Sequence, residues 1–311
     1  MVRLSLPPRL WQNTAAMERL TLLDGLRQIA DGYDAFILDL WGVLHDGKQP
    51  YPGVVDCLMA MKRAGKKRVI LSNAPRRIEP VIARLTEIGI PPEAYDGIMT
   101  SGQDAWEHLQ MRGRSAGIPF YAQLGKRCYF IGPDRDLGLL EKVVHERTDD
   151  PRAADFCLCT GIVERDDFLD AYEPALKALA KREVPMICAN PDLVVRHGDK
   201  MELCAGSLAA FYEELRGTVL YHGKPFPDIY DHVFSLLGHP DPQRTLAIGD
   251  SLRTDMGGAQ TIGIDGLLIT DGIHSEEFGI SDAGDIDMER VRAACDDEGL
   301  SPRAAMRRLV W

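Results

Sequence analysis

Apolar residues along the first third of the chain alternate between unbroken runs and spaced stripes. The runs at 34–40 and 67–75 are apolar on both faces and end in polar residues, a pattern typical of buried parallel strands. The stripes at 54–65 and 78–90 each end near a glycine and predict amphipathic helices. A short strand and a helix start follow at 96–106. This alternation predicts a doubly wound parallel α/β sheet, a fold that binds ligands at the carboxyl ends of its strands.

The remaining pattern predicts a second α/β unit. Residues 104–200 contain further apolar runs and a long helical stripe, but their turn residues differ, and the earlier strand–loop–helix repeat resumes after them. The simplest arrangement is a core domain of residues 1–103 and 201–311 with an α/β domain of residues 104–200 inserted into it. The segment before residue 30 and the tail after residue 284 both have helical patterns.

Composition narrows the class of protein. The 311 residues are 45% hydrophobic and 27% charged, which is typical of a soluble globular protein. The net charge of -11 gives no support for a nucleic-acid partner. No stretch approaches the roughly 20 apolar residues of a membrane span, and the start lacks the apolar core of a secretory signal. We therefore expect a cytoplasmic protein with neither a nucleic-acid nor a membrane partner.

The seven cysteines do not form a metal-binding pattern. The only close pair, Cys157 and Cys159, has no second pair to complete a zinc site. On a strand these two side chains face the same side, so burial in a core is the favoured interpretation. An odd number of scattered thiols also indicates a reducing compartment.

Polar side chains that a core does not need follow four of the predicted strands. They are Asp39, Ser72 with Asn73, Lys224, and Asp250 with Asp255. Because the carboxyl ends of parallel strands meet at one edge of a sheet, we expect these side chains to converge. Carboxylates suit a hard cation such as Mg²⁺, while a lysine, a hydroxyl and loop N–H groups suit phosphoryl oxygens. A single strand-end Asp is more often a turn or capping residue, but four such ends with complementary charges favour a magnesium and phosphate site.

Four segments resemble, in order and in type, the four motifs of the haloacid dehalogenase superfamily of phosphohydrolases. They are "DLWGV", "LSNAP", "GKPFPD" and "GDSLRTD", and the resemblance extends over most of the chain. It implies a Rossmann-like core and makes the inserted domain a type 2 cap. "ANPD" at 189–192, together with "GKPFPDIY", resembles the class IIA, NagD-like branch. "DxWGV" with a C-terminal "LVW" resembles a less characterised subfamily of that branch.

The resemblance implies catalytic roles at these positions. Asp39 would attack phosphorus and form an aspartyl-phosphate, which splits one hard displacement into two steps. Ser72 and Lys224 would hold the transferring phosphoryl group. Loop groups at Gly42 and Asn73 would bind the same group beside them.

The resemblance also implies metal and substrate ligands. The metal ligands would be Asp39, the backbone carbonyl of Trp41, Asp250 and Asp255, the last either directly or as support for the others. In the cap, Asn190 and Asp192 would face the substrate, although a turn closed by an Asx side chain explains "NPD" almost as well. For Arg196 and His197, a solvated loop is favoured over contact with an anionic substrate.

Trp41 departs from the superfamily pattern. Most phosphatases of the superfamily have a second Asp there, which protonates the leaving group and then activates water. An indole cannot transfer that proton, and general acid–base assistance is typically worth about 10²–10⁴-fold in rate. His45 and Asp46 are nearby candidates to replace the acid, with ordinary loop residues as the favoured alternative. A good leaving group, an acid supplied by the substrate, slow turnover or loss of catalysis would equally account for the indole.

The sequence thus predicts a Mg²⁺-dependent phosphatase acting on a small phosphomonoester, sugar-phosphate-like or nucleotide-like. One alternative is a catalytically weak or silent protein that binds a phosphorylated metabolite or a regulatory partner. Another is a phosphonate hydrolase that uses the same nucleophile. The sequence leaves the oligomeric state open. A homodimer is one arrangement, because caps of the branch that the chain resembles often mediate dimers.

Overall fold

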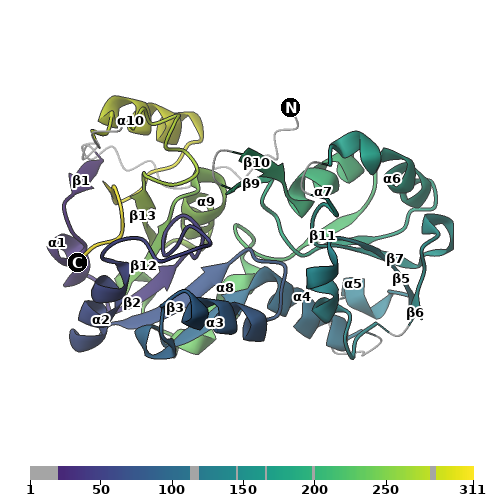
Figure 1. The fold of residues 1–311 in the computed structure, drawn as a ribbon, viewed down its shortest axis with the longest axis horizontal. Helices are drawn as coiled ribbons and strands as arrows, with labels where there is room; N and C mark the ends of the chain where they lie inside the picture. The colour runs from purple at the N-terminus through teal and green to yellow at the C-terminus, as the bar shows by residue number, and fades with distance from the viewer. Residues whose placement is uncertain (1–19, 113–118, 145, 165–166, 198–199, 281–284) are drawn as a thin grey trace.

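A computed structural model describes residues 20–311, except 113–118, 145, 165–166, 198–199 and 281–284. The described residues form two α/β units, each built on a parallel sheet (Figure 1). The larger sheet has seven strands and the smaller has five, and a separate two-stranded hairpin lies between the units. The predicted α/β class, with a Rossmann-like core and a second α/β unit, is confirmed.

The larger sheet is parallel throughout, in the order β1-β14-β13-β12-β2-β3-β4. Its strands are β1 (Thr21–Leu23), β2 (Ala35–Leu38), β3 (Lys67–Ser72), β4 (Gly97–Thr100), β12 (Thr245–Gly249), β13 (Asp265–Ile269) and β14 (Ala304–Met306). The helices of this unit are α1 (Arg27–Ala30), α2 (Val54–Arg63), α3 (Ile78–Glu87), α8 (Asp228–Leu237), α9 (Gly257–Ile262) and α10 (Met288–Asp297). The strands and helices expected between residues 34 and 90 form where the hydrophobic pattern places them.

Helices cover both faces of the larger sheet because its central strands are apolar on both sides. Phe36 and Leu38 of β2 pack with α2 and α3. Ala35 and Ile37, which alternate with them along the strand, pack with α8 and α9. The resulting three layers leave the carboxyl ends of β2, β3 and β12 free to carry polar side chains.

The smaller sheet is also parallel, in the order β11-β8-β7-β5-β6. Its strands are β5 (Arg127–Ile131), β6 (Glu146–Arg147), β7 (Phe156–Cys159), β8 (Met186–Cys188) and β11 (Val219–Tyr221), and the hairpin is β9 (Val194–His197) with β10 (Lys200–Leu203). Helices α4 (Ser101–Gln110), α5 (Pro119–Ala122), α6 (Glu173–Ala180) and α7 (Ala205–Glu214) accompany it. Cys157 and Cys159 share one face with α6 and α7, as predicted, and all seven cysteines are free and buried.

Two helical predictions near the chain ends are wrong in part. The lead-in contains the strand β1 before the short helix α1, and its first part lies outside the described residues. The tail forms the predicted helix α10 but then the strand β14. Both strands are three residues long and pair with each other, so their conformation depends on a partner about 280 positions away, which a local pattern does not encode.

The division between the units differs from the predicted boundary at residue 200. Strand β11 pairs with β8 of the smaller sheet, from Val219 opposite Met186 to Tyr221 opposite Cys188. Helix α7 packs on the same sheet through Leu208. By strand pairing, the inserted unit therefore extends to about residue 221. Within the described part of the chain, no helix combines the length and the apolar character that crossing a membrane requires.

Candidate active site

The central strands of the larger sheet bring two of the predicted carboxylates together. Asp39 directly follows β2, and Asp250 directly follows β12. These strands are paired, with Leu38 opposite Ile248, and the Asp39 N–H donates to the Ile248 carbonyl at 2.8 Å. Asp255 lies in the π-helical turn Leu252–Met256 that follows β12. The structure thus brings these three side chains to one sheet edge, as their positions after strands predict.

Lys224, which follows the last strand of the smaller unit, connects that unit to these carboxylates. It lies after β11, and its Nζ donates to Asp39 Oδ1 at 2.5 Å and to Asp255 Oδ1 at 2.6 Å. All three side chains are almost fully buried. Burial opposes the charge of Lys224, but the two carboxylates outweigh it and raise the pKa of the ammonium. Burial and the charge of Asp255 raise the pKa of Asp39 to about 7, against the effect of Lys224.

Asp39, Asp250 and Asp255 form a group whose ligand oxygens lie within 4.8 Å of one another. Burial, reinforced by the charge of Asp39, raises the pKa of Asp250 well above its usual value. One lysine does not balance three carboxylates at this distance. An all-oxygen set with excess negative charge is the kind of donor set that a hard divalent cation takes, so these residues fit such an ion.

Two glycines let the backbone approach Asp250 closely. A Cβ placed on Gly42 would lie 2.0 Å from Asp250 Oδ2, and one on Gly272 would lie 2.2 Å from the same atom. Gly42 also has a φ of +83°, which side chains rarely adopt. The Ile273 N–H donates to Asp250 Oδ2 at 2.8 Å and fixes the carboxylate. Gly42 therefore brings its backbone next to the Asp250 carboxylate, where a side chain would not fit.

Asn73 holds the Lys224 segment in place. Its Oδ1 accepts the Lys224 N–H at 2.8 Å, while its Nδ2 donates to the Lys224 carbonyl at 3.0 Å and to Asp192 Oδ1 at 2.9 Å. Ser72 is buried beside it, and its Oγ accepts the Ala74 N–H at 3.2 Å. The Ser72 hydroxyl hydrogen is free to turn toward a ligand because this contact uses only the oxygen.

The "ANPD" segment lies at the cavity and also forms the expected turn. Asn190 Oδ1 accepts the Asp192 N–H at 3.0 Å, which is the Asx contact that the sequence offered as an alternative. Burial raises the pKa of Asp192, with Lys224 and Asn73 opposing it. Arg253 donates to the Pro191 carbonyl at 2.9 Å and joins this loop to the larger unit.

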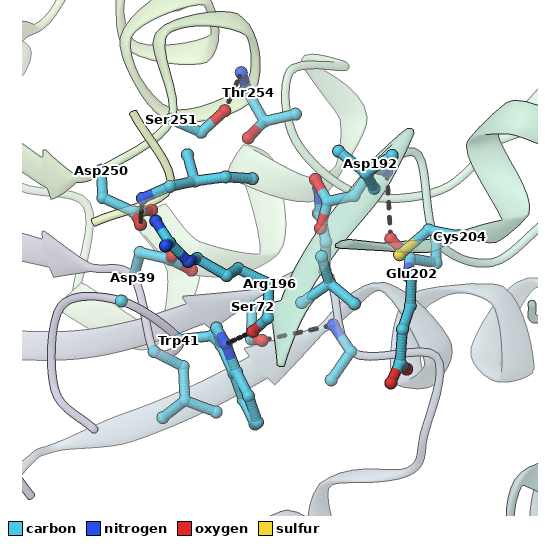
Figure 2. A pocket seen from close by; sticks show the side chains of 18 of the residues that line it. Asp39, Trp41, Ser72, Asp192, Arg196, Glu202, Cys204, Asp250, Ser251 and Thr254 are labelled. Atoms are coloured by element: carbon cyan, nitrogen blue, oxygen red, sulfur yellow. Dashed lines mark hydrogen bonds between the residues drawn. The ribbon is translucent and has the colours of Figure 1, made fainter. Parts of the chain in front are cut away.

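A cavity of about 690 Å³ separates the two units beside these carboxylates. Figure 2 shows Asp39 and Asp250 on one side of it and Asp192 with Glu202 on the other. Besides Lys224, its lining includes the guanidinium-bearing residues Arg76, Arg84, Arg135, Arg196, Arg253 and Arg308. The same lining contains seven carboxylates, so cationic and anionic side chains are equal in number there and the cavity is rich in charges of both signs.

Arg196 contradicts the solvated-loop interpretation. It lies on the hairpin strand β9, lines the cavity, and donates to Ser275 Oγ at 3.1 Å and to Glu276 Oε1 at 2.7 Å. Glu202 of β10, which no local sequence pattern singles out, lines the cavity as well. Local sequence patterns do not predict that this hairpin lies over the strand ends, because its position depends on how the two units pack.

The Trp41 indole joins the larger unit to the hairpin. Its Nε1 donates to the Arg196 carbonyl at 3.2 Å, and the contact is drawn in Figure 2. Its ring meets the His45 ring edge to face, with centroids 5.3 Å apart. A Cβ on Gly47 would lie 2.3 Å from the indole, so this glycine makes room for it. The indole thus has a packing and bridging function that an aspartate would not supply.

His45 and Asp46 are engaged within their own loop. His45 Nδ1 accepts the Gly47 N–H at 2.8 Å, and burial lowers the pKa of its imidazole to about 4. Asp46 Oδ1 accepts the N–H groups of Lys48 and Gln49, at 2.8 and 2.9 Å. These contacts favour the ordinary loop interpretation over a substitute acid for both residues.

Comparisons with known proteins agree with this arrangement. A family model described as haloacid dehalogenase-like hydrolase matches residues 36–145, and a second, HAD-hydrolase-like model matches residues 221–288. A crystal structure of a haloacid dehalogenase-like hydrolase from Brucella suis is 31% identical, with a TM-score of 0.76, over 93% of this chain and 100% of that one. The chain belongs to the haloacid dehalogenase-like hydrolase family.

Curated relatives of this haloacid dehalogenase-like hydrolase include phosphatases. A D-glycerol 3-phosphate phosphatase of Mycobacterium tuberculosis is 27% identical over 80% of this chain and 66% of that protein. Chronophin of Mus musculus is 28% identical over 81% of this chain and 86% of that protein. The predicted enzyme class, a phosphoric monoester hydrolase of this superfamily, is confirmed, and the relatives support the resemblance to its class IIA, NagD-like phosphatases.

Proposed function

We propose that this haloacid dehalogenase-like hydrolase is a Mg²⁺-dependent phosphatase that acts through an aspartyl-phosphate at Asp39. The observation that carries the proposal is the convergence of Asp39, Asp250 and Asp255 around Lys224 in a cavity rich in arginine. Such an arrangement supports phosphoryl transfer, in which positioning and electrostatic stabilisation do most of the work.

In the proposed reaction, Asp39 attacks phosphorus and the bond to the leaving oxygen breaks. Water then hydrolyses the acyl-phosphate, which restores the Asp39 carboxylate and releases phosphate. Lys224 and the Ser72 hydroxyl hold phosphoryl oxygens, with N–H groups at Gly42 and Asn73 beside them. Lys224 also favours the ionised form of Asp39, the form that acts as nucleophile.

Mg²⁺ is the proposed cofactor at the carboxylate group. Asp39, Asp250, Asp255 and the Trp41 carbonyl would hold it. When bound, the ion neutralises carboxylate and phosphoryl charge that Lys224 alone leaves uncompensated. The three buried carboxylates support this assignment because the single ammonium of Lys224 is shared between Asp39 and Asp255, which leaves negative charge in excess.

The proposed substrate is a small phosphomonoester. The cavity of about 690 Å³ falls within the usual range of small-molecule sites, and Lys224 and the arginines of its lining offer cations for the phosphoryl group. The relative named for D-glycerol 3-phosphate supports a short polyol phosphate, alongside sugar-phosphate-like and nucleotide-like esters. Asn190 and Asp192, on the cap side of the cavity, are the proposed substrate contacts there.

Trp41 favours a second candidate function. Since neither the indole nor His45 and Asp46 supplies an acid, a catalytically weak or silent protein that binds a phosphorylated metabolite is the alternative. We assign the chain to the subfamily with the "DxWGV" motif, in which the indole replaces the acid. Under the main proposal, the enzyme acts best on esters whose leaving group needs no proton.

The two functions can be separated with a reactive acyl or aryl phosphate. The phosphatase proposal predicts that wild-type protein becomes phosphorylated and turns over only with Mg²⁺, and that Asp39→Asn abolishes both. Asp46→Asn is the matched control, because it makes the same change of carboxylate to amide in the neighbouring loop. If the wild type shows neither phosphorylation nor turnover, and a metabolite raises the Tm of Asp39→Asn as much as that of wild type, the binding function is correct.

We also propose a cytoplasmic homodimer. Seven free, buried thiols suit a reducing compartment. The proposal of a dimer rests on the branch resemblance alone, and sedimentation velocity at several concentrations tests it. A single species of monomer mass at all concentrations would contradict it.

A further inference from the structure

A second cluster of titratable side chains lies away from the proposed active site. Three histidines surround the buried carboxylate of Asp104, which lies in α4. They are His108 of α4, His222 after β11 and His232 of α8. Ligand atoms of Asp104, His108 and His222 lie within 4.8 Å of one another. None of these four residues belongs to the described lining of the 690 Å³ cavity, so the proposed phosphatase reaction does not use them.

One oxygen of Asp104 is fully satisfied. Its Oδ2 lies 2.6 Å from His222 Nδ1, and His222 Nε2 lies 2.5 Å from the Tyr121 hydroxyl. An imidazole ring that donates from Nδ1 and accepts the Tyr121 O–H at Nε2 would satisfy both contacts. This half of the carboxylate is therefore fixed in orientation by a histidine and a tyrosine that are themselves buried.

The other oxygen of Asp104 has no hydrogen-bond partner within the described structure, although the residue is only 1% exposed. His232 Nδ1 is likewise a buried atom without such a partner there. A buried polar atom without a partner costs about 1–3 kcal/mol, so two of them side by side are unfavourable unless something else satisfies both. A cation bound between them would do so, because the carboxylate oxygen carries lone pairs and Nδ1 carries one in the tautomer protonated at Nε2.

The distances around Asp104 Oδ1 match those between ligands of a small cation. His108 Nδ1 lies 3.3 Å from Oδ1, and His232 Nδ1 lies 3.5 Å from it. Glu107 Oε2 lies 3.5 Å from His232 Nδ1. A tetrahedral ion with bonds of about 2.1 Å separates its ligand atoms by about 3.4 Å. These three separations are longer than those of good hydrogen bonds and close to the spacing between ligands of one ion.

We propose that Asp104, His108 and His232 bind a divalent transition-metal ion of the Zn²⁺ class, with Glu107 as the fourth ligand. Imidazole nitrogens with carboxylate oxygens suit Zn²⁺, whereas the all-carboxylate group at Asp39 suits a harder ion. Coordination replaces the present 2.8 Å contact of His108 Nδ1 with the Asp104 carbonyl. His222 and Tyr121 orient the ligand carboxylate from outside, as hydrogen-bonded partners of metal ligands do.

The position of this site gives it a structural function. Ala105 and Leu109 of α4 pack into the apolar cluster of the smaller unit, whereas α8, which carries His232, packs on the larger sheet. An ion shared by α4 and α8 therefore joins the two units next to the segment that leads to Lys224. Four protein ligands leave no open position, which is typical of structural rather than catalytic zinc.

Titration of the purified, chelator-treated protein with Co²⁺ tests the proposal, because tetrahedral Co²⁺ absorbs visible light. We expect visible bands that saturate near one equivalent, and a Zn²⁺-induced rise in Tm. The double variant His108→Gln/His232→Gln should lose both effects, with affinity reduced by more than about 100-fold, since even outer partners of metal sites contribute about 10–100-fold. His239→Asn, at an exposed histidine with a φ of 56°, is the matched control and should titrate like wild type.

Two further proteins separate this site from the proposed Mg²⁺ site. Asp250→Asn should keep the visible Co²⁺ bands, because Asp250 is not a ligand of the Asp104 cluster. The single variant His232→Gln, at a side chain that is 34% exposed, should lose the bands even if the double variant folds poorly. Absence of visible bands in wild type, or bands that persist in His232→Gln or disappear in Asp250→Asn, would overturn the proposal. None of these results depends on phosphatase activity.

Discussion

At the scale of single residues, Trp41 determines how the leaving group of the proposed reaction obtains its proton. Trp41→Asp should raise kcat on alkyl phosphates by about 10²-fold or more, because it restores a general acid where the leaving group needs one. It should change turnover of an aryl phosphate such as 4-nitrophenyl phosphate much less, since that leaving group departs without a proton. Steady-state kinetics on the two ester types measures the difference.

Trp41→Phe is the control for the loss of the indole itself. It keeps an aromatic ring beside His45 but removes the hydrogen bond to the Arg196 carbonyl. If Trp41→Asp and Trp41→Phe have the same ratio of alkyl to aryl turnover, the missing acid does not limit the rate. In that case the enzyme obtains its proton by another route.

His45 gives a prediction for the effect of pH on stability. Burial lowers its pKa in the folded state to about 4, below the value near 6.5 in the unfolded chain. As pH falls below 6.5, the unfolded state binds the proton first, so stability is lost. Between pH 7 and pH 5 this contribution amounts to about 2 kcal/mol. Urea unfolding at the two pH values measures it.

His45→Gln is the comparison for that measurement. The Gln side chain can still accept the Gly47 N–H, but it does not titrate. We expect the loss of stability between pH 7 and pH 5 to be smaller in the variant by about 2 kcal/mol. An identical loss in both proteins would show that His45 is protonated in the folded state as readily as in the unfolded one.

The sequence revealed the proposed catalytic residues at this scale because each follows a buried strand. Asp39, Ser72 and Asp250 stand directly at strand ends, where a polar side chain is unexpected and therefore informative. Glu202 could not be found in this way. It lies on a hairpin whose position over the cavity depends on the packing of two units and not on its own neighbours.

At the scale of elements, the loop after β2 tests how closely backbone and carboxylate must approach. Gly42→Ala should abolish most activity, because its Cβ would lie 2.0 Å from Asp250 Oδ2 and must displace it. The positive φ of +83° adds about 1–2 kcal/mol of strain to the folded state. Activity and unfolding free energy, measured together, report the two effects.

Gly65→Ala separates strain from displacement. Gly65 has a φ of +71°, similar to that of Gly42, but a Cβ there meets nothing within 4 Å. We expect a similar loss of about 1–2 kcal/mol in stability with normal kcat. If Gly42→Ala keeps wild-type kcat at a temperature where it is folded, the position of Asp250 does not depend on this glycine.

The central elements were predictable and the edge strands were not. Strands β2 and β3 are apolar runs flanked by amphipathic helices, so their pattern and their location agree. Strand β1 has only Leu23 buried, and β14 is three residues long. Neither carries enough residues for a period to be visible, and only their mutual pairing makes them strands.

At the scale of the whole molecule, the carboxylate group predicts that Mg²⁺ stabilises the fold. Without a metal ion, Asp39, Asp250 and Asp255 repel one another in a buried space where Lys224 offsets only part of their charge. Mg²⁺ at 100 times its Kd should add about 2.7 kcal/mol to the free energy of unfolding, and EDTA should remove it. Thermal unfolding in the two conditions measures the effect.

Asp250→Asn should make the protein more stable without metal and less responsive to Mg²⁺. It removes one of the repelling charges, so we expect a higher Tm than wild type in EDTA and a smaller gain from Mg²⁺. Equal Tm values for wild type in EDTA and in Mg²⁺ would contradict the proposed metal site.

The boundary between the two units also belongs to the scale of the whole molecule, and the sequence did not predict it. The pairing of β11 with β8 that sets it is a contact across more than 30 residues.

The strand order has a consequence for the protein during its synthesis. Strand β2 lies between β12 and β3 in the finished sheet, but residue 245 leaves the ribosome about 200 residues after β2. The smaller unit is made in the interval and can complete its sheet at residue 221. Until β12 and α9 are made, one edge of β2 stays open to other chains, and the face of β2 and β3 that α8 and α9 later cover is not fully covered. We therefore expect nascent chains stopped near residue 240 to need chaperones, and chains released past residue 306, where β14 is complete, to fold without them.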